Sequence, residues 1–256
     1  TILACGGLGG VYKHSTNCKH ISGDALALAL YHNVKLENVD YVQIHPTTLF
    51  TRQSGRSFLI SESVRGEGAH LLDKDGNRFV DELLPRDVVA NAIYEQMKKD
   101  GTEHVWLDFS PIDKDEILNH FPNIYQHCLE AGYDPLKEPV PVVPAQHYFM
   151  GGVHVDKDSK TTMEQLYAIG ETSCNGVHGR NRLASNSLLE SLVFAKRAAK
   201  DIASKTEFKK AKNFDSLVDL SSYQDLYTLM DNFHAMVKAE IDKQKKLRKA
   251  KEKDNE

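Results

Sequence analysis

The chain has 256 residues, a formal net charge of −4 and a hydrophobic fraction of 41%. This length and apolar content are enough for one large domain or two modest ones with a proper core. The acidic balance argues against the clustered basic surface of a non-specific nucleic-acid binder, so no nucleic-acid partner is expected. Any anionic ligand must therefore be held by a few placed cations.

Cysteine spacing and hydropathy indicate the cellular compartment in which the protein is expected. The four cysteines stand far apart and form no Cys-x-x-Cys pair, which is typical of reduced thiols. No apolar run is long enough to span a bilayer, and the first residues lack the basic segment of a signal peptide. We therefore expect a cytoplasmic protein without membrane association. The chain opens on an apolar strand, which is typical of a fragment that begins inside a domain.

The N-terminal part alternates short strands and helices. Residues 1–5 predict a buried strand, and the glycines after it predict a loop able to take positive φ. Ser22 and Asp24 precede strong helix formers at residues 25–30, which predicts a helix with a polar cap. Residues 39–44 predict the next strand.

The middle of the chain mixes strands, turns and helices. An Asp-Gly turn within residues 73–77 predicts a hairpin. Pro85 predicts a helix start, and a further helix is expected over residues 115–131, after a strand at 105–109. The proline-rich residues 138–144 cannot be helical and are expected to cross between domains in extended form.

The last part returns to alternating elements. Strands are expected at residues 153–155 and 166–169, then a helix over about 185–202 and helix again from 208 onward. The nearly all-charged residues 243–256 predict a solvated or frayed end.

The sequence lacks the motifs of two common kinds of site, metal centres and serine hydrolase active sites. Twelve histidines are scattered without His-Glu-x-x-His or paired Cys/His spacing, so no metal is expected. The Gly-x-Ser-x-Gly elbow of serine hydrolases is also missing. The loop that contains Gly7 and Gly9 lacks the third glycine of a dinucleotide fingerprint, and a tight turn is its alternative interpretation.

Several polar residues in the middle of the chain suit an anionic ligand. His45 follows a predicted strand, where it could bind a carboxylate or be a satisfied buried histidine. Glu62 and Arg65 stand three residues apart, and Arg86 opens a predicted helix; ordinary ion pairs are the alternative. His147 follows the proline-rich crossing, and domain junctions commonly form ligand clefts.

Residues 170–190 are the most specific segment. Arg180 and Arg182 lie just before Ser185 and Ser187, which precede a helical pattern. Free amide groups at such a helix start bind anions or an electron-rich ring edge, such as that of a reduced flavin. The alternative is an ordinary helix cap with two surface arginines.

Eight motifs in this order resemble the flavoprotein family of succinate dehydrogenases, fumarate reductases and L-aspartate oxidases. The resemblance runs from residue 1 to about residue 202, and residues 144–148, 166–171 and 184–190 are most similar to its aspartate-oxidising members. The motifs are Ala4-Cys-Gly-Gly, Ser22-Gly-Asp, Gln43-Ile-His-Pro-Thr, Glu62-Ser-Val-Arg-Gly-Glu-Gly, Pro85-Arg-Asp, His147-Tyr, Gly151-Gly-Val and the segment 170–190.

The resemblance implies an FAD enzyme that oxidises L-aspartate to iminoaspartate, the first step of bacterial NAD biosynthesis. Oxygen or fumarate would accept the electrons, and quinolinate synthase would be a further partner. A succinate dehydrogenase or fumarate reductase flavoprotein subunit is one alternative. An inactive fragment is the other.

The resemblance also assigns residues to the site. It places Asp24, Glu171, Asn186, Ser187 and Leu188 around the flavin, and His45, Thr47, His147 and Arg182 at the substrate carboxylates. Arg86 would handle the substrate proton while hydride passes to flavin N5, with Glu62 and Arg65 as its relay. Because free arginine does not deprotonate in the working pH range, electrostatic work by Arg86 is the alternative.

The expected fold is α/β, with a partial, Rossmann-like FAD-binding domain interrupted by an α+β capping domain and followed by a short helical region. The expected boundaries are 1–38 and 149–217 for the FAD-binding domain, 39–148 for the capping domain and 218–256 for the helical region. The family's N-terminal FAD fingerprint is missing from the chain, as is the acidic loop that selects the amino group. We therefore expect the isolated chain to bind FAD poorly.

Overall fold

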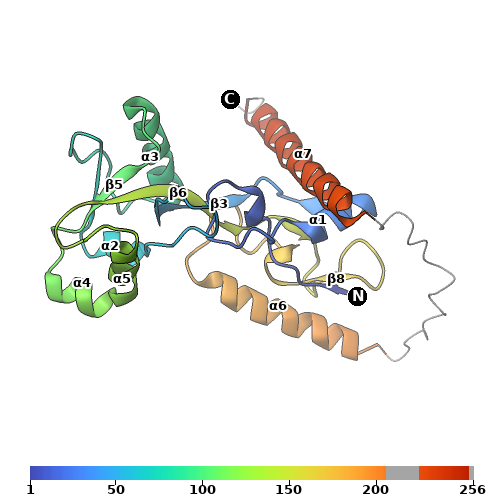
Figure 1. The fold of residues 1–256 in the computed structure, drawn as a ribbon. Helices are drawn as coiled ribbons and strands as arrows, with labels where there is room; N and C mark the ends of the chain where they lie inside the picture. Colours follow the sequence, from blue (N-terminus) through green and yellow to red (C-terminus); the bar gives the residue numbers. More distant parts are fainter. Residues whose placement is uncertain (206–224, 254–256) are drawn as a thin grey trace. The chain divides into compact units, whose positions relative to one another are not determined.

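The computed structural model describes residues 1–205 and 225–253, which fall into two compact units with mixed α/β structure (Figure 1). The predicted fold class is thereby confirmed. Unit 1 comprises Thr1–Val11, His20–Val42 and Tyr148–Glu256, and unit 2 comprises Tyr12–Lys19 and Gln43–His147. The predicted assignment of these parts as FAD-binding and capping domains stays a prediction.

The described residues of unit 1 form two small sheets, three α-helices and two short 3-10 helices. In the first sheet, β1 (Ile2–Leu3) pairs in parallel with β8 (Tyr167–Ala168). The second sheet has the order β2 (Leu36–Glu37), β7 (Gly152–His154) and β9 (Ser173–Cys174). The helices are η1 (Gly9–Val11), α1 (Asp24–Tyr31), η2 (Gly170–Thr172), α6 (Asn186–Ala203) and α7 (Leu226–Lys253).

The start of α1 differs from the prediction. Its N-cap is Gly23, with φ 86° and no side-chain cap, and Ser22 instead donates its hydroxyl to Asp24. A Cβ at Gly23 would lie 3.4 Å from a methyl carbon of Val237 on α7. Glycine therefore supplies both the left-handed backbone and the space that α7 needs to pack on α1.

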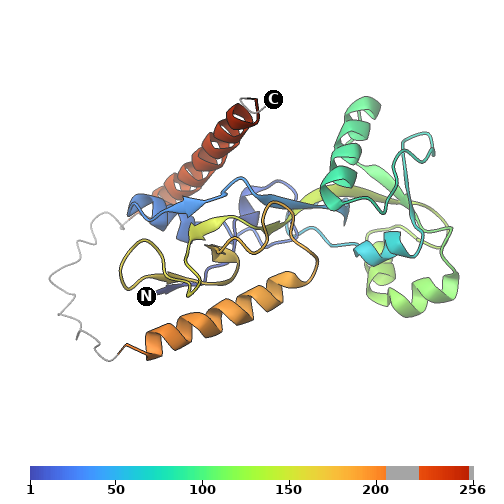
Figure 2. The same ribbon diagram turned by 180° about the vertical axis from the view of Figure 1, so that it is seen from behind.

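Helix α7 corrects the expectation of a frayed end, whereas most of its charged residues after Lys243 are exposed to solvent, as expected. It continues through the charged segment as far as Lys253 and packs on α1 (Figures 1 and 2). Arg248 forms a bidentate pair with Asp40, with Nε–Oδ2 and Nη2–Oδ1 distances of 2.6 and 2.7 Å. It also donates to the Tyr41 hydroxyl. The predicted helix over residues 208–224 lies outside the described residues.

Replacing Arg248 with alanine should lower the free energy of unfolding of unit 1 by about 2 kcal/mol, because charge-assisted hydrogen bonds to the nearly buried Asp40 are lost. Chemical denaturation monitored by circular dichroism measures this loss. Lys249→Ala changes an exposed neighbour on the same helix and serves as the control. Equal stability of the two variants would contradict a stabilising role for Arg248.

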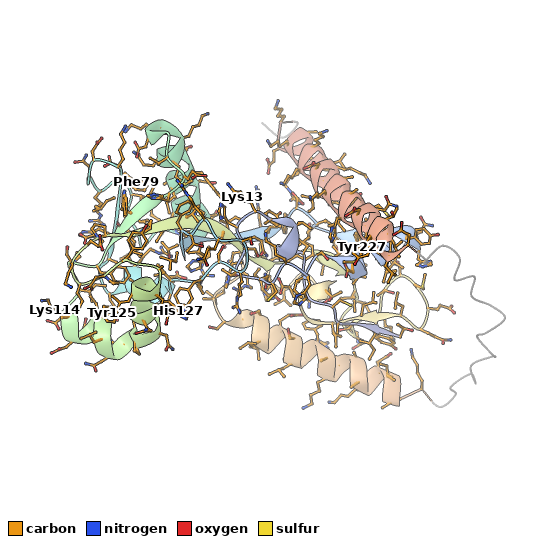
Figure 3. All side chains as sticks on the ribbon, in the orientation of Figure 1. Lys13, Phe79, Lys114, Tyr125, His127 and Tyr227 are labelled. Atoms are coloured by element: carbon orange, nitrogen blue, oxygen red, sulfur yellow. The ribbon has the colours of Figure 1, made fainter. Side chains whose placement is uncertain are left out.

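Unit 2 is built around a four-stranded sheet. The strand order is β3 (Val42–Leu49), β6 (Val140–Phe149), β5 (Val105–Asp108) and β4 (His70–Leu72). The helices are α2 (Glu62–Gly66), α3 (Arg86–Asp100), α4 (Lys114–His120) and α5 (Pro122–Glu130). Leu71, Ile93 and Leu107 are fully buried in its core, and Phe79 and Tyr125 pack against that core (Figure 3).

Two predictions for unit 2 need correction. The single helix expected over residues 115–131 is two helices, because Pro122 cannot donate a backbone hydrogen bond and instead begins α5. His45 lies inside β3, not after its end. The Asp-Gly turn is present and is closed by a hydrogen bond from Asp73 N to Asn77 O, although the hairpin has only one bridge, Leu72 to Arg78.

The described part of the chain contains no helix long and apolar enough to cross a membrane.

Candidate functional site

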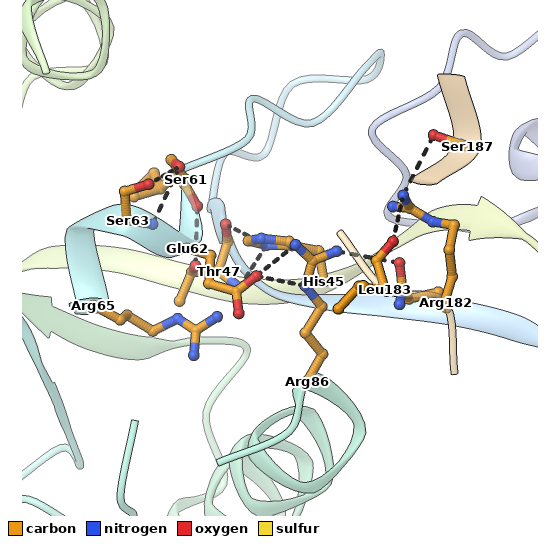
Figure 4. Close-up of polar contacts among 12 residues, drawn as sticks. His45, Thr47, Ser61, Glu62, Ser63, Arg65, Arg86, Arg182, Leu183 and Ser187 are labelled. Carbon is orange, nitrogen blue, oxygen red and sulfur yellow. Dashed lines mark hydrogen bonds and ion pairs between the residues drawn. The ribbon is translucent and has the colours of Figure 1, made fainter. Parts of the chain in front are cut away.

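Unit 2 gathers most of the predicted polar residues near the end of one sheet. His45 and Thr47 lie on β3, and His147 lies on the neighbouring strand β6. Glu62 and Arg86 are the first residues of α2 and α3 (Figure 4). Two strands and two helix starts therefore hold these side chains.

Arg86 is oriented by residues distant in sequence. Its Nε lies 2.8 Å from Glu62 Oε2, and Nη2 also donates to that oxygen. Its Nη1 donates to Gln43 Oε1 at 3.1 Å. Since the Arg86 side chain is only 13% exposed, this carboxylate and amide fix the guanidinium in a partly desolvated place.

The structure brings Glu62 and Arg86 together, but it gives Arg65 a different contact. Arg65 is 3% exposed, and its Nη1 donates to the carbonyl oxygen of Glu82. Its Nε and Nη2 have no hydrogen-bond partner among the described residues. Burial lowers the pKa of Arg65, and Arg86 lowers it further, while Glu62 and Glu82 raise it. Arg65 thus adds a second buried positive charge near Arg86.

His45 is a neutral donor or acceptor in this cluster. It is 1% exposed, and its ring lies edge-on to His147 at 5.5 Å between centroids. Burial moves the pKa of His45 well below its ordinary value, and the charges of Arg86, His147 and Arg65 lower it further. The positive charge here is therefore carried by arginines.

Hydroxyl groups complete this part of unit 2. The Thr47 hydroxyl donates to the carbonyl oxygen of Ile60 at 3.1 Å, and Thr16 Oγ1 lies 2.9 Å from His147 Nδ1. The neutral ring of His45, the ring of His147 and these hydroxyl groups lie beside two guanidinium groups, an environment suited to a carboxylate.

Unit 1 holds Arg182 in the segment just before α6. Its Nη1 donates to the Ser187 hydroxyl at 3.3 Å and to the Leu183 carbonyl at 3.5 Å (Figure 4). The guanidinium lies over the ring of Tyr148, 4.5 Å from its centroid, and His178 meets that ring edge-on at 5.6 Å. Arg182 is thus supported by an aromatic face and a helical hydroxyl.

The first turn of α6 is open toward solvent. Its N-cap, Ser185, has φ 66° and its side chain makes no cap hydrogen bond, while the Asn186 and Leu188 amides donate to the carbonyl oxygens of Leu183 and Ser185. Leu188 and Leu189 are 73% and 62% exposed. The positive end of a helix dipole beside exposed apolar side chains suits a flat, electron-rich ring.

Glu171 is held close to the N-terminal glycine loop. Its Oε1 accepts a hydrogen bond from Phe149 N at 2.8 Å. A Cβ on Gly7 would lie 2.6 Å from that oxygen, so glycine is required for this approach. Burial raises the pKa of Glu171 to about 7, against the lowering by the Phe149 N–H and Arg182. The remaining flavin candidate, Asp24, lies exposed at the start of α1.

The raised pKa of Glu171 predicts a pH effect on stability. Ionising this carboxyl is costlier in the folded chain, so its contribution is complete below pH 4.5 and is lost as pH rises through 7. Glu171→Gln should remove roughly 2 kcal/mol of this dependence, allowing for partial solvent screening. Denaturation at pH 4.5 and pH 8 tests the change, with the exposed Glu164→Gln as control. An unchanged pH profile in Glu171→Gln would contradict it.

Three residues of these clusters were not among the predicted site residues. Gln43 accepts a hydrogen bond from Arg86, Tyr148 lies beneath Arg182, and Glu190 is 5% exposed and accepts from Asn175. The only sequence signal for Gln43 and Tyr148 was their place in the same motifs as His45 and His147.

Comparisons with known proteins agree on the class of fold. The family described as FAD binding domain matches residues 1–188. The L-aspartate oxidase of Clostridium perfringens is 54% identical over 88% of this chain and 50% of its own length. That of Clostridium acetobutylicum is 56% identical over 79% of this chain and 47% of its own length. The chain therefore spans about half the length of these curated relatives.

Two solved structures are also similar to this chain in fold. A quinol-fumarate reductase with menaquinol molecules matches with a TM-score of 0.74 and 34% identity, over 83% of this chain and 40% of that chain. The Mycobacterium smegmatis Sdh1 in complex with UQ1 matches with a TM-score of 0.69 and 36% identity, over 89% of this chain and 39% of that chain. Each shares the fold with this chain at an identity high enough to compare residues.

Proposed function

Because the chain belongs to the FAD binding domain family, we propose that the complete protein is an FAD-dependent enzyme that oxidises L-aspartate to iminoaspartate. The two L-aspartate oxidases of 54% and 56% identity support this substrate. The observation that best supports an oxidation reaction is the position of Arg86. Its guanidinium is held by Glu62 and Gln43, near the buried Arg65. We further propose a place in NAD biosynthesis, with oxygen or fumarate as the electron acceptor.

The residues of unit 1 fit a flavin. The first turn of α6 offers the positive end of a helix dipole for the negative charge of the ring, and the exposed Leu188 offers apolar surface. We propose that Asn186, Ser187 and Leu188 lie against the ring, and that Asp24 and Glu171 bind the polar remainder of FAD. When bound, FAD accepts the hydride that leaves the substrate.

The substrate carboxylates need charge and hydrogen-bond donors. His45, Thr47 and His147 are proposed to bind one carboxylate: the imidazole N–H groups would donate to it, and the Thr47 hydroxyl would donate to it in place of its bond to the Ile60 carbonyl. Arg182 is proposed to bind a carboxylate through its fork of N–H groups, with Tyr148 holding the guanidinium plane.

Arg86 is proposed to act on the substrate proton. Its contact with Glu62 would place a carboxylate where the proton could pass next, and Arg65 adds a buried positive charge nearby. A guanidinium releases its proton reluctantly, so part of the work of Arg86 is stabilising the negative charge that develops on the substrate. Glu62 keeps the guanidinium oriented for both roles.

A donor comparison tests this function. The purified full-length protein, loaded with FAD, is assayed with L-aspartate or succinate as donor and with oxygen or fumarate as acceptor. We expect aspartate to be oxidised at least about a hundredfold faster, which corresponds to roughly 3 kcal/mol of discrimination. Preference for succinate would replace the proposal by the second candidate, a succinate dehydrogenase or fumarate reductase flavoprotein, which the structural matches favour.

Flavin binding by the isolated chain is tested separately. A flavin absorbance spectrum of the purified 256-residue chain distinguishes a cofactor-binding protein from a folded module without cofactor.

A coupled assay with quinolinate synthase tests the proposed use of the product, because iminoaspartate must be consumed before it hydrolyses.

A further inference from the structure

Unit 2 contains a cavity of about 360 Å³ that the proposed function does not use. Segments near residues 13–19 and 49–57 form its walls. Four cations line it: Lys13, Lys19, Arg52 and Arg56. Glu103 is the one acidic side chain among the described residues that line it, so the lining carries net positive charge although the chain as a whole is acidic.

Lys13, Arg52 and Arg56 keep most of their hydrogen-bonding capacity for a ligand. Glu103 lies 3.9 Å from Lys13 Nζ and also 3.9 Å from Arg52 Nη2, which is the outer limit of an ion pair. Such exposed and distant pairs are worth little, so an incoming anion displaces them at small cost. Arg56 forms no ion pair within residues 1–205 and 225–253. Lys13 is labelled in Figure 3.

Backbone hydrogen bonds hold the two walls together. Ser57 N donates to Ser15 O at 2.7 Å, which ties one segment to the other. Lys19 Nζ donates to the carbonyl oxygens of Tyr12 and Lys13 at 2.8 and 3.2 Å, so it closes the shorter segment on itself. The cavity is therefore a shaped feature of unit 2.

An aromatic surface forms part of the wall. Phe50 lies between His104 and His14, with ring centroids 4.9 and 6.4 Å away. Its backbone N–H donates to Pro141 O of β6, which anchors the residue to the sheet. A flat heteroaromatic ring can stack on such a surface.

His14 reports the local electrostatic potential. Burial lowers its pKa, and the charges of Lys13 and Lys19 lower it further, against a raising effect of Glu103. An anion bound among these lysines would oppose that lowering. The ring of His14 thus offers a probe of occupancy inside the cavity.

We propose that this cavity binds an organic diphosphate, with the phosphates among Arg52, Arg56 and Lys13 and a heteroaromatic ring against Phe50. Guanidinium forks match phosphate oxygens in geometry, and lysine adds point charge. The volume lies in the range of small-molecule sites. The ligand is bound without chemical change, and the site is separate from the residues proposed for aspartate oxidation.

Calorimetric titration of the full chain with ADP tests the proposal, with inorganic pyrophosphate and adenosine as part-ligands. The test variant is Arg52→Gln/Arg56→Gln. The control is Lys98→Gln/Lys114→Gln, which removes the same charge from exposed positions of unit 2 outside the cavity. We expect ADP to bind the parent and the control with a Kd below about 1 mM and the test variant at least about tenfold more weakly.

Two further readouts complete the experiment. ADP should raise the pKa of His14, followed by NMR of its ring, and should bind more tightly than either pyrophosphate or adenosine. Equal ADP affinity of the parent and Arg52→Gln/Arg56→Gln, including no binding to either, would overturn the proposal, because any ADP bound then lies elsewhere, as at the flavin site. Pyrophosphate binding as tightly as ADP would overturn the ring contact with Phe50.

Discussion

Replacing Arg86 with leucine in the full-length protein is expected to lower kcat for aspartate oxidation by about a thousandfold or more, with FAD still bound. The guanidinium is held by Glu62 and Gln43 in a largely buried place, so no water or neighbouring side chain reproduces its charge at the same point. Steady-state kinetics with a flavin absorbance spectrum of each preparation measures both quantities.

Neighbouring variants separate this role from simple loss of folding. Lys98→Leu removes a cation from an exposed position on the same helix and should leave kcat within about twofold of the parent. Glu62→Gln should lower kcat less than Arg86→Leu does, since it loosens the guanidinium without removing it. Full turnover by Arg86→Leu would exclude Arg86 from the chemistry.

Replacing Arg182 with leucine should raise KM for aspartate by about a hundredfold, since a charge-assisted contact with a carboxylate is lost. Arg182→Lys should restore little of this, because a lysine lacks the planar fork that lies over Tyr148 and donates to Ser187. Substrate titrations of the flavin-loaded protein give KM and kcat separately for each variant.

Tyr148 and Arg180 provide the matched comparisons. Tyr148→Phe keeps the ring beneath Arg182 and should retain the parent KM, whereas Tyr148→Leu should raise it about tenfold. Arg180 lies two residues from Arg182 in an exposed pair with Glu252, so Arg180→Leu should change KM little. A KM that rises equally in Arg180→Leu and Arg182→Leu would point to general loss of charge.

Local signals in the sequence predicted the elements that depend on neighbouring residues. Pro85 predicted the start of α3, and the apolar pattern after Ser187 predicted α6 close to its observed bounds. These predictions succeeded because helix starts and helical periodicity are set within a few residues. The helix expected over residues 115–131 was wrong because Pro122 begins a second helix inside it.

Contacts between distant residues could not be predicted in the same way. Glu62 lies three residues from Arg65, yet its carboxylate binds Arg86. Arg248 lies in a run of lysines that resembles a solvated tail, yet it pairs with Asp40. In both cases tertiary packing selects the partner, and spacing along the chain carries no information about it. The site residues proposed above come from the order of the family motifs, which spacing alone did not supply, and their roles stay predictions.

The way the chain passes between its units has a consequence for biosynthesis. Ile2 of β1 pairs with Tyr167 of β8, and all of unit 2 lies between them in sequence. At a translation rate of about 5–20 residues per second, β1 waits roughly 10–30 s for its partner to be synthesised. Unit 2 has most of its residues in one continuous stretch, so it can fold on the ribosome first. During that delay the unpaired β1 is a target for chaperones and for misassembly.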